Sequence, residues 1–123
     1  MLSSVFVMIK AAKSVVHDIT AQKNRIDKFL QSSGFRFTAF LSDAFGASGR
    51  NIIRHLIEYG SIDREALDKC VKTKARNRID EILIALNGSL SVHQRRFLNM
   101  VFLHLEELEA HKHTILLLLF FCP

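Results

Sequence analysis

Almost nothing in this chain would interrupt a helix. Its only proline is Pro123, the last residue, and only five of its 123 residues are glycine. Because proline and glycine are the residues that most often break helices and form tight turns, many short strands joined by turns are not expected. The sequence therefore predicts an all-α fold.

The first thirty residues carry an apolar heptad pattern. Its positions follow one another at steps of four and three, and Lys23 occupies the one position that breaks the series: Val5, Ile9, Ala12, Val16, Ile19, Ile26 and Leu30. Such a stripe predicts a long helix, from about residue 3 to residue 32, that ends before Gly34.

A second heptad series occupies the end of the chain. Ser91 is a good N-cap for a long helix whose inner positions are Leu98, Val101, Leu105, Leu108, Lys112, Ile115 and Leu119. Coiled-coil-like pairing is expected for the two long helices. The pattern leaves open whether they pair with each other or across a homo-oligomer.

Short helices are expected between the long ones. One should begin near Ser48 and Gly49, bury Ile52, Ile53, Leu56 and Ile57, and end at Gly60; a second should be capped by Ser61 or Asp63. A third should run from about Lys74 to Leu86 and stop at Asn87 and Gly88. Phe35, Phe37 and Phe40 form either a short extended piece or, as we favour, apolar plugs that dock onto the first helix.

These elements divide the chain into three sections. Residues 1–34 form the long N-terminal helix, residues 35–88 the short-helix cluster, and residues 89–123 the coiled-coil helix with an atypical apolar tail. The tail, residues 115–122, is much shorter than the about 20 residues that a helix needs to cross a bilayer. No membrane association is therefore expected.

Composition favours a folded cytoplasmic protein. Apolar residues make up 49% of the chain and charged residues 24%, which does not match the apolar-poor, highly charged composition of disordered proteins. The two cysteines, Cys70 and Cys122, have neither metal-ligand spacing nor the density of a disulfide framework. A reducing compartment is the simplest environment for them.

The net charge of +5 is unevenly distributed. Residues 1–40 carry +4, residues 41–70 carry −1, residues 71–96 carry +4 and residues 97–123 carry −2. Basic blocks attract phosphate backbones without reading sequence, although they also occur as solvated helix faces. The candidate nucleic-acid-binding residues are Arg25, Lys28, Arg36, Arg50, Lys72, Lys74, Arg76, Arg78, Arg95 and Arg96.

No catalytic or metal site is expected. Cleavage of a phosphodiester by two metal ions needs several carboxylates close together, and no pair of acids here has a spacing that suggests one. His104 and His111, one heptad apart, are more simply two surface histidines. Ser48 lacks an activating partner and is interpreted as a helix cap, although the backbone of Ser48 and Gly49 together with Arg50 could hold a phosphate.

The run Leu41-Ser-Asp-Ala-Phe-Gly-Ala-Ser-Gly-Arg50 resembles a signature of the insertion-sequence transposases of the IS-one-ten type, the RNA-guided bridge recombinases. Further landmarks follow in the family's order over about residues 15–111. They are Asn24 to Leu30, Phe35 to Phe37, Ile62 to Leu67, Lys74 to Ile79, Leu86 to Gly88, His93 to Leu98 and Leu105 to Glu109.

The resemblance implies the helical section between a RuvC-like catalytic domain and the coiled coil. In the family, the catalytic acids, which use magnesium, lie upstream of this section, and the nucleophilic serine lies beyond the coiled coil. We therefore expect a transposase fragment that cannot cut DNA and needs no cofactor itself. Its expected partners are DNA, a guide RNA as a further candidate, and copies of itself.

The tail from Thr114 to Pro123 departs from the family pattern, because the family's coiled coil keeps polar outer positions there. Two other functions compete with the transposase hypothesis. One is a helical oligomerisation module whose basic blocks only keep it soluble. The other, less favoured, is a small protein held at a membrane by Ile115 to Cys122.

Overall fold

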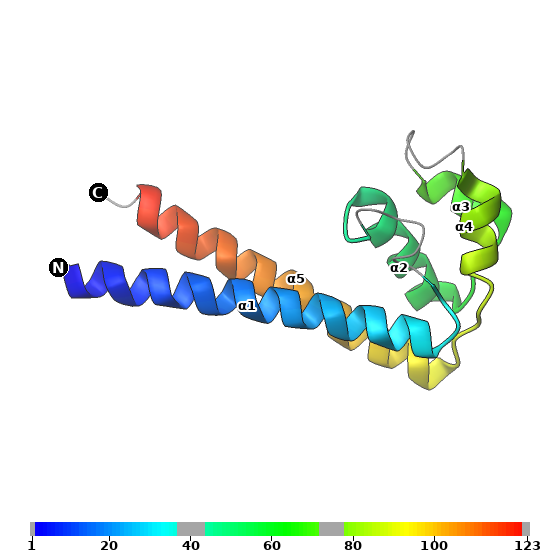
Figure 1. The fold of residues 1–123 in the computed structure, drawn as a ribbon, viewed down its shortest axis with the longest axis horizontal. Coiled ribbons are helices and arrows are strands. Elements are labelled where there is room, and N and C mark those ends of the chain that lie inside the picture. Colours follow the sequence, from blue (N-terminus) through cyan, green and yellow to red (C-terminus); the bar gives the residue numbers. More distant parts are fainter. Residues whose placement is uncertain (1, 37–43, 72–77, 122–123) are drawn as a thin grey trace.

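The computed structural model describes residues 2–36, 44–71 and 78–121. Over these residues the fold is all-α, as predicted, and contains no strand. In chain order the helices are α1 (Leu2–Ser32), α2 (Ala47–Tyr59), α3 (Arg64–Cys70), α4 (Ile79–Ala85) and α5 (Val92–Phe121). Two long helices thus enclose a cluster of short ones in the sequence (Figure 1).

The long helices pack against each other within one chain. α1 and α5 run antiparallel, so that the beginning of α1 and the end of α5 lie at the same end of the molecule (Figure 1). Ile26 and Leu30 of α1 and Leu98 and Leu105 of α5 are completely buried. Of the two arrangements that the heptads allowed, the structure therefore contains pairing inside the chain.

The paired region covers only part of each long helix. Ile19 and Leu108 are the outermost buried apolar residues of α1 and α5, and beyond them the two helices diverge (Figure 1). We call residues 3–17 and 112–121 the distal arms, and the opposite end, where α1 ends and α5 begins, the junction end. Val5, Ile9 and Val16 lie in the predicted stripe but are exposed, because the diverging α5 no longer covers them.

The short helices form a second layer beside the junction end. α2 packs on α5 and α3, and α3 packs on α4. Ile52, Ile53 and Leu56 of α2, Leu67 of α3 and Ile82 of α4 are buried in one core with the long helices. The stripe predicted for α2 is therefore confirmed at these three positions.

Backbone hydrogen bonds tie the cluster to the long helices. The amide of Arg36, just after α1, donates to the carbonyl of Ala85 at 3.0 Å, and the amide of Leu90 donates to the carbonyl of Gly60 at 2.8 Å. Gly34 and Gly60 have φ angles of 94° and 80°, the left-handed conformation that ends a helix and that glycine adopts without strain. Both predicted helix ends are confirmed.

The predicted N-caps have mixed outcomes. Ser91 and Gln94 form a capping box: the amide of Gln94 donates to Ser91 Oγ at 3.2 Å, and the amide of Ser91 donates to Gln94 Oε1 at 2.8 Å. Asp63 caps α3 through the amide of Ala66. Ser48 was predicted as the cap of α2 and is not, because that helix begins at Ala47 with Gly46 at the N-cap position.

Two further predictions fall partly outside the described residues. The helix expected from Lys74 is described only from Ile79, and residues 74–77 lie outside the described part. Phe35 is fully buried, in agreement with an apolar plug, whereas Phe37 and Phe40 lie outside the described residues. No helix of residues 2–36, 44–71 and 78–121 is both long and apolar enough to cross a membrane.

Candidate nucleic-acid interface

The ten basic residues selected from the sequence fall into three groups. Lys72, Lys74 and Arg76 lie outside the described residues. Arg50, Arg78 and Arg95 have partners within the fold. Arg25, Lys28, Arg36 and Arg96 are exposed.

Arg50 links the short-helix cluster to α5. Its Nη1 and Nη2 atoms donate to Glu109 Oε1 and Oε2 at 2.8 and 2.7 Å, and its Nε donates to the carbonyl of Phe45 at 2.7 Å. The Arg50 guanidinium group also lies 6.0 Å from the ring centroid of Phe102. These contacts use most of its donors, so its main role in this fold is to hold α2 against α5.

Arg95 and Arg78 are also used inside the molecule. The Nε and Nη2 atoms of Arg95 donate to the carbonyls of Ile57 and Glu58, at the end of α2, where carbonyls lack partners within the helix. Arg78 lies at the N-cap position of α4 and pairs with Glu81 at 3.2 Å. Arg95 therefore fixes the end of α2 on the start of α5.

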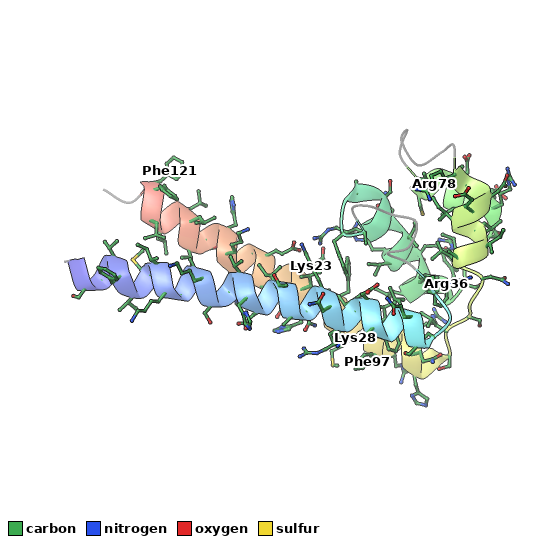
Figure 2. All side chains as sticks on the ribbon, viewed as in Figure 1. Lys23, Lys28, Arg36, Arg78, Phe97 and Phe121 are labelled. Atoms are coloured by element: carbon green, nitrogen blue, oxygen red, sulfur yellow. The ribbon has the colours of Figure 1, made fainter. Side chains whose placement is uncertain are left out.

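The four exposed cations gather at the junction end. Arg25 and Lys28 lie in the last turns of α1, Arg36 follows that helix, and Arg96 lies near the start of α5. Figure 2 shows Lys28 and Arg36 in this part of the molecule. None of the four forms an ion pair with a carboxylate of the described residues; Arg25 donates only to the neutral amide oxygen of Gln22, at 2.6 Å.

An aromatic pair joins α1 and α5 at the junction end. Phe29 of α1 and Phe97 of α5 have ring centroids 4.9 Å apart with planes tilted by 49°. Phe97 keeps 39% of its surface exposed, whereas Phe29 is half-buried. Arg25 precedes Phe29 by one helical turn, and Arg96 directly precedes Phe97.

Sequence reasoning did not select Phe97. The heptad pattern selected its neighbour Leu98, which is fully buried, and treated the residues outside the seam as a polar surface. One signal was available, because an aromatic residue outside the seam directly follows two arginines. That neighbourhood of cation and ring is typical of surfaces that bind nucleic acids.

A shallow groove lies between α1 and α5 and begins one helical turn beyond Phe97, at Met100. It is lined by Gln22 and Arg25 on α1 and by Met100, Leu103 and His104 on α5, with Glu107 at its far end. Met100 and Leu103 are exposed although they are large and apolar. The groove thus combines apolar walls with one arginine.

The acidic residues of α5 mostly face the short helices. Glu109 binds Arg50 and Glu106 binds Arg54, whose guanidinium group lies 5.6 Å from the ring centroid of Phe102. On the part of α5 beside the aromatic pair, residues 92–105, the sequence has no Asp or Glu. The acidic charge of the C-terminal block is therefore separated from the exposed cations of the junction end.

Side chains that could bind a metal ion do not come together in the described part of the chain. No three His, Cys, Asp or Glu side chains there are close enough to hold a metal ion. His104 lies 3.8 Å from the carboxylate of Glu107, and His111 is exposed.

Gly49 is buried where a Cβ atom would lie 1.7 Å from the carbonyl oxygen of Ala44. The absence of a side chain at Gly49 therefore allows close packing of the backbone.

Comparison of the chain with protein-family models, with curated proteins and with solved structures gives no match.

Proposed function

We propose that this chain is a transposase segment that binds the phosphate backbone of nucleic acids through the junction end and carries out no catalysis itself. The exposed cations Arg25, Lys28, Arg36 and Arg96 would contact phosphates, and the short-helix cluster would hold the two long helices in place. The resemblance of residues 15–111 to the IS-one-ten transposases supports DNA transposition as the process.

One observation carries the binding proposal. Among the seven candidate residues that the structure describes, Arg50, Arg78 and Arg95 have intramolecular partners, whereas the four at the junction end leave their charge to solvent. Charges on exposed side chains without carboxylate partners attract phosphates and release the counterions that surround them.

The proposal is tested by fluorescence anisotropy titration with a labelled DNA duplex and a labelled RNA hairpin at several salt concentrations. If the four cations contact phosphates, the slope of log affinity against log salt should be roughly −3 to −4 for duplex DNA. The double variant Arg25→Gln/Lys28→Gln should make that slope shallower by roughly 2.

A matched control exists on the same helix. Lys10 and Lys13 are exposed, have the same spacing as Arg25 and Lys28, and lie in the distal arm. The variant Lys10→Gln/Lys13→Gln removes the same charge and should leave the slope nearly unchanged. Equal losses in the two double variants, or affinity that is insensitive to salt, would contradict the proposal.

The distal arms favour a second function, self-association. They expose large apolar side chains on both helices: Val5, Phe6, Val7, Ile9, Val16, Leu117, Leu118, Phe120 and Phe121. Figure 2 shows Phe121 at the tip of α5. Because the heptad positions of the buried region continue into the arms, the arms of a second copy would present matching side chains.

Sedimentation velocity tests this second function. The native chain should form a dimer or larger assembly, and the variant Phe6→Ser/Phe121→Ser should shift it toward the monomer. Tyr59→Ser is the control, because Tyr59 is also an exposed aromatic residue but lies on α2. A native chain that stays monomeric at all concentrations would exclude assembly through the arms.

A further inference from the structure

We infer that the junction end binds unpaired nucleotides, in DNA or RNA, by stacking a base on the exposed ring of Phe97. This inference rests on the proposed function and specifies its ligand. It names a contact with a base, which the phosphate contacts of the cations alone do not provide.

The ring of Phe97 is held in place by the core below it. Its neighbours Leu98 and Val101 are buried in the α1–α5 interface, and Phe29 covers part of the ring from the other helix. Two aromatic residues at 4.9 Å restrict each other's rotation, while the uncovered part of Phe97 faces solvent. A rigid, partly exposed ring loses little conformational entropy when a base stacks on it.

Three cations are close to the two rings in sequence, on both helices. Arg25 lies one turn before Phe29, Lys28 directly precedes Phe29, and Arg96 directly precedes Phe97. Figure 2 shows Lys28 and Phe97 in the same region of the junction end. A nucleotide stacked on Phe97 would therefore have its flanking phosphates within reach of long basic side chains.

Two acids lie in this region: Asp27 on α1, and Glu107 at the far end of the groove, 3.8 Å from His104. Asp27 is half-buried, and its Oδ2 atom accepts a hydrogen bond from Gln31 at 2.9 Å. Asp27 lies two positions before Phe29, and residues two apart on a helix point in different directions. The Asp27 carboxylate therefore does not lie on the same face of α1 as the Phe29 ring.

Stacking on Phe97 selects single strands. In a duplex the faces of each base are covered by the neighbouring base pairs, so the ring can stack only on a base whose face is free. The groove beside Phe97, with Met100 and Leu103 as apolar walls and Arg25 at its edge, offers space for the next nucleotide. A surface that recognised phosphates alone would instead favour the duplex, whose charge density is higher.

The chain contains no tryptophan, which permits a direct test. In the variant Phe97→Trp, the single indole retains a stacking surface and reports contact with a base by fluorescence quenching. Titration with a short unstructured oligonucleotide, as DNA and as RNA, should quench this fluorescence. Titration with a blunt duplex of the same length should change it little.

The variant Phe97→Leu tests the contribution of the ring to affinity. Because leucine offers no aromatic face on which a base can stack, the leucine variant should bind the single strand about tenfold more weakly. Its affinity for the duplex should change by less than about twofold. Tyr59→Leu, which removes an exposed aromatic ring on α2, is the control, and far-UV circular dichroism verifies that each variant remains helical.

The outcomes separate this inference from the proposed function. Suppose that Arg25→Gln/Lys28→Gln weakens binding, whereas Phe97→Leu leaves the affinity for single strand and duplex unchanged or lowers both equally. Phosphate binding then stands, and base stacking is overturned. An indole whose fluorescence is unaffected by bound single strand overturns it as well. If the native chain binds no nucleic acid even at low salt, both are wrong.

Discussion

Arg50 on α2 and Glu109 on α5, 59 residues apart in sequence, form a two-pronged ion pair with N–O distances of 2.8 and 2.7 Å. Their side chains are only 19% and 32% exposed. One turn along both helices, Arg54 and Glu106 form a single contact of 3.2 Å, with Arg54 52% exposed. Two ion pairs of different burial thus join the same two helices.

The half-buried Arg50–Glu109 pair should contribute more stability than the exposed Arg54–Glu106 pair. Glu109→Gln keeps the size of the side chain but removes the charge facing Arg50, and we expect a loss of about 1–2 kcal/mol in the free energy of unfolding. Glu106→Gln should change it by less than about 0.5 kcal/mol, because an exposed pair is well solvated. Urea unfolding followed by circular dichroism measures both. Equal effects in the two variants would mean that burial does not govern their strength.

Two adjacent arginines should have opposite roles. Arg95 binds carbonyls at the end of α2, so Arg95→Gln should lower the free energy of unfolding by about 1 kcal/mol with a small effect on nucleic-acid affinity. Arg96 is exposed, so Arg96→Gln should change stability by less than about 0.5 kcal/mol but weaken nucleic-acid binding.

Each variant of this arginine pair is the control for the other. The measurements are urea unfolding and anisotropy titration on both proteins. Binding that is reduced equally by the two changes would show that the charge of this part of α5 acts as a whole. The separation into a structural and a binding arginine would then be wrong.

Gly49 should tolerate no side chain. A Cβ atom there would overlap the carbonyl group of Ala44, which belongs to the backbone and cannot turn away. Gly49→Ala should therefore destabilise the fold by about 2–4 kcal/mol. Gly34→Ala is the comparison, because its left-handed φ is unfavourable for alanine but its nearest neighbour is 3.7 Å away; about 1–2 kcal/mol is expected. A Gly49→Ala variant as stable as the native chain would disprove the close contact.

The boundaries of the long helices were easier to predict from the sequence than the contacts between them. The α1 and α5 boundaries follow from local signals, namely the heptad stripes, Gly34 and the Ser91 cap. A stripe identifies which face of a helix is apolar, but it does not say how far the other helix covers that face. For this reason the exposure of Val5, Ile9 and Val16 could not be predicted.

It was harder still to predict which polar side chains are buried or bound within the fold. Lys23 was recognised as a break in the heptad, yet the polar group buried in the interface is the adjacent Gln22, which is 2% exposed and donates from Nε2 to the carbonyl of Val101 at 2.8 Å. The hydrogen bonds that Arg50 and Arg95 form within the fold likewise depend on partners distant in sequence. Charge counting cannot separate such residues from the exposed Arg25 and Arg96.

Cys70, at the end of α3, should react slowly with thiol reagents. Burial raises the pKa of its thiol above the ordinary value of 9.0, so less of the reactive thiolate is present in the folded chain than in the unfolded chain. In a Cys122→Ser background, alkylation by iodoacetamide should therefore require higher pH in the folded protein than in urea.

The same shift of the Cys70 pKa makes a prediction about stability. Between the two thiol pKa values the native state binds more protons than the unfolded state, so the contribution of this thiol is fully present below 9.0 and declines as the pH rises through the raised value. The stability difference between the Cys122→Ser protein and Cys70→Ala in that background should accordingly fall at alkaline pH. A difference that stays constant, together with equal alkylation rates in the folded and unfolded chains, would mean that Cys70 is open to solvent.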